Sequence, residues 1–132
     1  MTPVDPFDLP DWLGTAEVTW TAQDGVRTGH LVAGLLSAAG AEPVACDLLA
    51  VDEAYPTPVA DDDVRHGAHQ AWRHGEVHLL DRAGRLTIAV PGTVFDADRV
   101  LDALERLTRA VGAAPERYAV CLRLGDGRSP GR

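Results

Sequence analysis

Four of the five histidines of this chain fall within thirteen residues, from His66 to His78, and three aspartates, Asp61 to Asp63, stand directly before them. Imidazole and carboxylate groups bind metal ions, transfer protons and change charge near neutral pH. The histidine segment, residues 61–78, is therefore the part of the sequence where we first look for chemistry.

The first part of the histidine segment has the pattern of a helix that ends near Arg73. Aspartates favour a helix start, and Gly75 is a typical stop. At about 100° per residue, Asp62, His66 and His69 share one face. The opposite face is apolar and consists of Val64, Ala68, Ala71 and Trp72. We therefore expect the apolar face to cover a sheet and the histidines to point outward.

The spacing of Asp62, His66 and His69 can place three ligands on one zinc or other divalent transition-metal ion. Further ligands would have to come from His74, Glu76, and Asp52 or Glu53. The tighter zinc-enzyme pattern, two histidines four apart with a glutamate between them, is absent. Three interpretations stay open: an exposed polar face, a partner surface whose affinity changes as the histidines titrate, and a metal site.

Other catalytic patterns are missing from the sequence. It contains no phosphate-binding glycine loop and no serine in a nucleophile-elbow pattern. We therefore expect a domain without catalytic activity or a bound cofactor. Three aromatic side chains could anchor a partner, namely Phe7 and Trp12 in a proline- and aspartate-rich arm and Trp72 at the edge of its helix's apolar face. The alternative is that the arm folds back onto the domain and Trp12 covers an edge of the core.

The length of 132 residues suits one domain with its own core. We place an N-terminal arm at residues 1–13, a single α+β domain at 14–125 and a flexible tail at 126–132. Two widely separated cysteines, Cys46 and Cys121, predict buried free thiols in a reducing cytoplasm. The sequence shows no secretory signal and no apolar run near the roughly 20 residues that cross a bilayer.

The charge is unevenly distributed along the chain. The net charge of −8 argues against binding to nucleic acid or to anionic membranes. Residues 1–63 carry −11 and residues 64–132 carry +3. The two halves attract each other within one fold, or the acidic region meets a basic partner or a second copy. All basic residues are arginine, and lysine and asparagine are absent, as is typical of a high-GC bacterium.

The hydrophobic pattern predicts the order β-β-β-α-β-β-α-β, a mostly antiparallel sheet with two amphipathic helices on one face. The strands are expected at 17–21, 27–36, 44–51, 76–80, 85–90 and 117–124, and the helices at 61–73 and 96–111. Within the second helix, Val100, Leu104, Leu107 and Val111 form one apolar stripe.

The β-β-β-α-β-β-α part of this order, with the small size and acidity, is similar to that of the secretion-chaperone-type domains. Members of that family are dimers that hold other proteins. This chain departs from the family in lacking its initial helix and in adding a last strand. The resemblance implies an acidic, cytoplasmic protein-interaction or adaptor domain that binds a protein partner or a second copy of itself.

Overall fold

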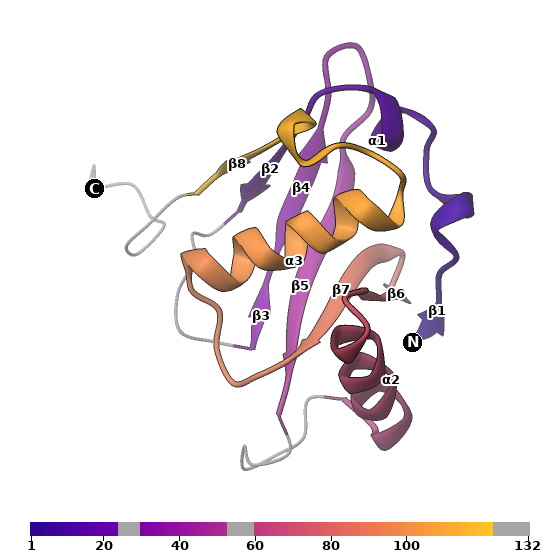
Figure 1. Ribbon diagram of the computed structural model, residues 1–132, viewed down its shortest axis with the longest axis vertical. Coiled ribbons are helices and arrows are strands. Elements are labelled where there is room, and N and C mark those ends of the chain that lie inside the picture. The colour runs from indigo at the N-terminus through magenta and orange to yellow at the C-terminus, as the bar shows by residue number, and fades with distance from the viewer. Residues whose placement is uncertain (24–29, 53–59, 123–132) are drawn as a thin grey trace.

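Within residues 1–23, 30–52 and 60–122, which the computed structural model describes, eight strands form one mixed sheet and three helices accompany it (Figure 1). The strands are β1 (Thr2–Pro3), β2 (Val18–Ala22), β3 (Leu31–Val32), β4 (Gly34–Ser37), β5 (Val44–Val51), β6 (His78–Arg82), β7 (Arg85–Pro91) and β8 (Tyr118–Cys121). The helices are α1 (Trp12–Thr15), α2 (Asp62–Arg73) and α3 (Ala97–Ala110), with 3-10 turns η1 (Pro6–Asp8) and η2 (Pro115–Arg117). The α+β class is confirmed.

The centre of the sheet is a parallel pair, β5 and β7, so the prediction of a mostly antiparallel sheet was wrong. The register runs from Cys46 beside Leu86 to Val51 beside Pro91. After β5 the chain passes through α2 before it returns, and a helical crossover permits parallel alignment. Residues 46–51 and 86–90 are all buried. Such continuous burial is typical of strands that are covered on both faces.

The strand order, β1-β6-β7-β5-β4-β2-β8, also differs from the predicted arrangement of sequence neighbours. β6 and β7 do form the expected antiparallel hairpin. β8 pairs in parallel with β2, where Val18 lies beside Tyr118. The predicted strand at 27–36 begins outside the described residues, and its described part is divided into β3, which pairs with β5, and β4, which joins β5 to β2.

The two long helices begin and end close to their predicted bounds. The Asp61 side chain accepts a hydrogen bond from the Val64 amide at 2.9 Å, and the Asp96 side chain accepts one from the Arg99 amide at 2.8 Å. These side chains satisfy backbone N–H groups that have no partner within the helix. The aspartates before both helices therefore act as caps, and for α2 this confirms the prediction that the run Asp61 to Asp63 starts the helix.

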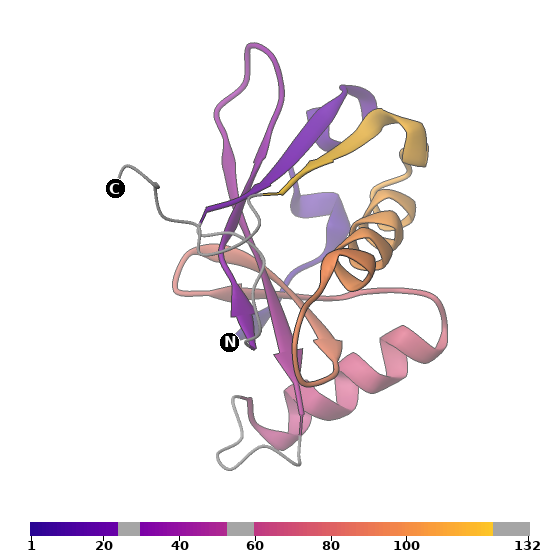
Figure 2. The ribbon, with the colours of Figure 1, turned by 90° about the vertical axis from the view of Figure 1, so that its left-hand side faces the viewer.

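Helices α2 and α3 cover opposite faces of the sheet, which corrects the prediction that they share one face. Figure 2 shows them on the two sides of the β6–β7 hairpin. Alternate residues of β5 belong to different apolar clusters: Leu48 packs with α3, and Leu49 packs with α2. Because side chains alternate across a strand, a strand that is apolar at every position can hold a helix on each side.

The arm at residues 1–13 is held against this sheet. β1 pairs with the outer edge of β6, and the Val4 amide donates to the Leu79 carbonyl at 3.0 Å. Leu13 is fully buried, and its carbonyl accepts a hydrogen bond from the Tyr118 hydroxyl. Both ends of the arm are therefore fixed. The predicted tail at 126–132 lies outside the described residues.

The two cysteines differ in environment. Cys46 is buried, where burial raises the pKa of its thiol, but Cys121 is exposed on β8, contrary to the prediction that both are buried. Both are free thiols. In the part of the chain that the structure describes, no helix has the length and apolar character needed to span a membrane.

Candidate functional site

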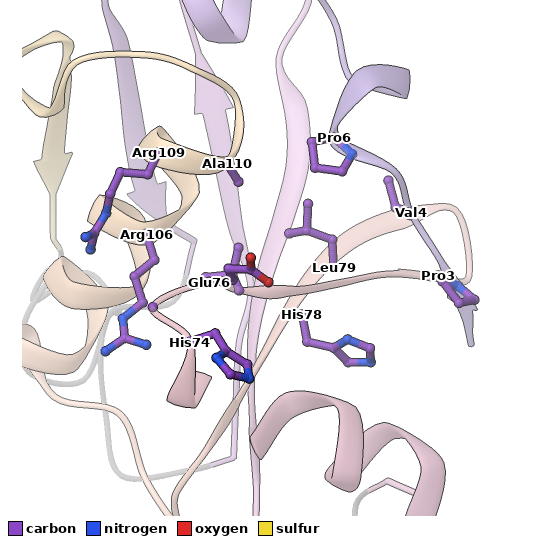
Figure 3. Close-up of a pocket in the computed structure, with 12 residues that line it drawn as sticks. Pro3, Val4, Pro6, His74, Glu76, His78, Leu79, Arg106, Arg109 and Ala110 are labelled. Atoms are coloured by element: carbon purple, nitrogen blue, oxygen red, sulfur yellow. The ribbon is translucent and has the colours of Figure 1, made fainter. Parts of the chain in front are cut away.

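A groove of about 590 Å³ lies where the arm, the start of β6 and the last turns of α3 meet (Figure 3). We call it the arm groove. It is lined by Pro3, Val4 and Pro6 of the arm, by residues 74–79, and by Arg106, Arg109 and Ala110 of α3. In Figure 3 the arm prolines stand on one side and the α3 residues on the other, with Glu76, His78 and Leu79 between them. Its size lies within the range of about 300–1,000 Å³ that is usual for ligand pockets.

The turn after α2 places the polar side chains of the arm groove. Gly75 adopts a φ of +80°, a left-handed conformation that glycine enters without strain, and its amide donates to the Trp72 carbonyl at 3.0 Å. The Glu76 amide closes the turn on the Ala71 carbonyl at 2.7 Å. His74 and Glu76, on either side of Gly75, are consequently exposed at the end of the helix.

His78, the next histidine, lies between the sheet and α2. A Cβ at Gly67 of α2 would lie 2.7 Å from its Cε1 atom, so the absence of a side chain at Gly67 makes room for the ring. Burial lowers the pKa of His78, because burial disfavours the charged imidazolium. His78 is therefore a half-buried, neutral wall of the groove near pH 7.

Arg106 closes the α3 side of the groove. Its guanidinium lies 3.5 Å from the centre of the Trp72 ring and donates to the Trp72 carbonyl at 2.6 Å. Its Nε atom is 3.5 Å from the Asp102 carboxylate. Arg109, one turn on, is more exposed and lies 4.0 Å from Glu105. Each arginine thus has a carboxylate partner on α3, and the stacking fixes Arg106 in place, so Arg109 is the more available cation of this wall.

Phe7 is the sequence neighbour of a residue that lines the arm groove. It follows Pro6, which lines the groove, and its side chain is 95% exposed. The turn that carries it is ordered, because the Asp5 carboxylate accepts a hydrogen bond from the Phe7 amide at 2.9 Å and Pro6 occupies the first position of η1. An aromatic side chain is thus presented to solvent on a fixed turn.

The other two predicted anchors are less available than Phe7. Trp12 and Trp72 are both partly buried and pack against the main apolar cluster. Trp72 is also covered on one ring face by Arg106. Of the three aromatic residues that the sequence singled out, Phe7 alone has the exposure that a partner anchor needs.

The predicted polar face of α2 is present. Asp62, His66 and His69 are exposed and line one shallow hollow of about 410 Å³. Arg65 and Arg73 line the same hollow, and Arg65 forms an ion pair with Asp62. Across the residues at 1–23, 30–52 and 60–122, no group of three or more His, Cys, Asp or Glu side chains is arranged to hold a metal ion.

A buried charge cluster on β5 is a second feature that the sequence reasoning missed. The Asp47 side chain is fully buried and accepts hydrogen bonds from Arg85 Nε at 2.7 Å and from Arg82 at 2.8 Å. A further Arg85 nitrogen, at 2.8 Å, and the Gly34 amide, at 3.2 Å, bind its other oxygen. Burial acts to raise the pKa of Asp47, but these hydrogen bonds outweigh it and hold the pKa below the usual range.

These arrangements differ in what they can do chemically. The Asp47 carboxylate is already saturated with donors, so it stabilises the sheet and is closed to a ligand. The arm groove combines apolar surface from Val4 and Val77 with arginines at one wall. Such a surface suits an apolar group that has carboxylates beside it. The sequence signal for it was modest: His74 and Glu76 flank a helix-stopping glycine.

Comparison with models of protein families, with curated proteins and with solved structures found no match for this chain.

Proposed function

We propose that this chain is a small protein-interaction domain of the adaptor or chaperone-like kind, and that it binds its partner through Phe7 and the adjoining arm groove. The observation that carries the proposal is the 95% exposure of Phe7 on a turn fixed by Asp5. Buried aromatic side chains are common energetic centres of protein interfaces. An aromatic group that is already ordered loses little entropy on binding, which favours affinity.

The charges support a protein partner over a nucleic acid. Asp5, Asp8 and Asp11 flank Phe7 in the sequence and are exposed, and the first basic residue of the sequence is Arg27. A surface of this kind repels phosphates and attracts arginine- or lysine-bearing surfaces. We propose that the domain acts in the cytoplasm, where its free cysteines, Cys46 and Cys121, would stay reduced.

Site-specific photocrosslinking tests the proposal. Benzoylphenylalanine placed at position 7 should give one discrete crosslinked protein in cells of the source organism. The matched control places it at position 101, because Leu101 is 48% exposed on α3 and does not line the groove. The partner identified by mass spectrometry should bind purified wild-type protein and lose affinity for Phe7→Ala. If position 7 gives no product beyond that of position 101, the proposal fails.

A metal-binding role at Asp62, His66 and His69 is the second candidate. It is favoured because these three side chains line one hollow. The two arginines in the same hollow oppose it, because they repel a cation and one of them already pairs with Asp62.

A further inference from the structure

We propose that the partner of the Phe7 surface is a second copy of this chain, and that each copy inserts Phe7 into the arm groove of the other. This inference rests on the proposed protein-binding role and specifies its occupant. A single chain carries both the exposed aromatic group and a groove with an apolar floor. The aromatic group is next to the groove in sequence, since Pro6 lines the groove and Phe7 follows it.

The arrangement of the two features fits a closed dimer. In a two-fold interface the same patch is used on both copies, so a protruding group and its receiving groove must be neighbours on one surface. Phe7 and the arm groove meet this requirement. A two-fold axis between them lets both insertions form at once and leaves no unfilled groove from which further copies could be added.

Opposite charge on the receiving surface centres on Arg109, because Arg106 is paired with Asp102 and the exposed Glu76 lines the same groove. Phe7 is flanked by the exposed carboxylates of Asp5, Asp8 and Asp11. The wall that would receive them carries Arg106 and Arg109 of α3. Arg109 is the freer of the two, since its side chain is 55% exposed and its contact with Glu105 is 4.0 Å long. Opposite charges at such a rim guide association and fix its orientation.

The apolar floor suits the Phe7 ring. Val4 and Val77 line the groove and are partly exposed, and the ring would replace water on them. A phenylalanine buries about 150–250 Å², so two insertions with the surface they cover come to roughly 600–1,000 Å². Stable interfaces bury about 1,200–2,000 Å². The arm beside Phe7 must add contact, and we expect a reversible dimer with a dissociation constant in the micromolar range.

Sedimentation equilibrium from low micromolar to millimolar concentration measures this association. Wild-type protein should show a monomer–dimer equilibrium. A typical interface hot spot changes the dissociation constant by about 30-fold. Since a dimer of Phe7→Ala lacks this side chain in both copies, its dissociation constant should rise by about 30-fold for each copy. Leu101→Ala, which also removes an exposed apolar side chain, should leave it unchanged. Circular dichroism confirms that each variant is folded.

A charge exchange tests the proposed rim. Asp8→Arg and Arg109→Asp should each weaken the homodimer, because each places like charges at both contacts. A mixture of the two variants should form a heterodimer that has opposite charges at both contacts. Photocrosslinking from position 7 in a mixture of isotope-labelled and unlabelled chains should yield mixed products at residues 74–79. The proposal of a dimer built on Phe7 is refuted if wild-type protein is monomeric at every concentration. It is also refuted if Phe7→Ala leaves the dissociation constant of the dimer unchanged.

The two proposals can fail separately. If the chain is monomeric but position 7 crosslinks to a different protein that requires Phe7, the protein-binding role stands and self-pairing is refuted. If position 7 crosslinks to nothing, in cells or in purified protein, both are refuted.

Discussion

Replacing Asp47 with asparagine should destabilise the fold more than any exposed charge substitution. The Asp47 carboxylate is fully buried and receives four hydrogen bonds, three from the guanidinium groups of Arg82 and Arg85 and one from the Gly34 amide. Asparagine has almost the same shape, but it removes the negative charge and replaces one acceptor oxygen by a donor. Two arginines would then share a site without a counter-ion.

The loss of unfolding free energy in Asp47→Asn depends on how exposed the two arginines are. Removing one partner of a buried ion pair costs about 3–5 kcal/mol. The Arg82 and Arg85 side chains are 30% and 33% exposed, so water can solvate them in part after the substitution. We therefore expect a loss of about 2–3 kcal/mol, below the fully buried range. At this chain length, that corresponds to a fall in Tm of about 6–10 °C.

Urea unfolding at pH 7, followed by circular dichroism, measures the loss. Asp62→Asn is the matched control, because Asp62 also pairs with an arginine but its side chain is 90% exposed. Exposed pairs contribute little, so this variant should unfold as the wild type does. If Asp47→Asn loses less than about 1 kcal/mol, the value expected for one ordinary hydrogen bond, the stabilising role of the cluster is refuted.

The difference in unfolding free energy between wild type and Asp47→Asn should also depend on pH. The pKa of Asp47 in the folded protein is held below its ordinary value of 3.8. The stability that Asp47 contributes is therefore complete well above pH 3.8 and is lost as the pH falls through that value toward the lower folded pKa. The stability difference between wild type and Asp47→Asn should stay constant near neutral pH and narrow below pH 3.8.

Two further predictions concern the histidines. Burial lowers the pKa of His78 from 6.5, so the unfolded chain binds a proton that the folded protein does not, and stability should fall as the pH drops below 6.5. His78→Gln should reduce this slope in urea unfolding, whereas the exposed-face control His69→Gln should retain it. If Asp62, His66 and His69 bind a metal ion, protein without a histidine tag should retain about one zinc per chain. His66→Ala should then abolish zinc binding. Metal-free protein after zinc addition and dialysis would contradict it.

Much of the local structure could be predicted because its signals lie close together in the sequence. The apolar stripe through Val100, Leu104 and Leu107 and the aspartate before it define α3 almost to the residue. The β6–β7 hairpin likewise follows from two strand-like runs joined by a short turn around Gly84. Such features depend on neighbours a few residues away, which a single sequence displays directly.

The pairing of distant strands was the part that the sequence pattern could not supply. Short turns favour antiparallel neighbours, but β5 and β7 are separated by α2 and β6, and β8 returns to β2 from the far end of the chain. The unbroken apolar run Leu48–Val51 was the available signal. An antiparallel strand with one face in solvent alternates between apolar and polar residues. An unbroken apolar run instead favours a central strand that has a helix on each face.

The same reasoning accounts for the charge cluster. Asp47 interrupts the apolar run of β5, and Arg82 and Arg85 flank a turn that comes more than thirty residues later. Burying a carboxylate without a partner costs too much free energy. Asp47 in such a strand therefore predicts an ion pair with a cation from another part of the chain. Which arginine does so depends on the parallel register of β5 and β7, and that register was missed.

The histidine segment divides between two surfaces once the fold is known. His66 and His69 remain on the outer face of α2, whereas His74 and His78, beyond the glycine that ends the helix, turn toward the arm groove. A helical wheel places His66 and His69 correctly. It does not apply to His74 and His78, because the chain leaves the helix before Gly75. The residues with most potential for recognition are therefore those just after the helix. They gain that potential because the N-terminal arm pairs with the edge strand β6, so that Pro3, Val4 and Pro6 line the same groove.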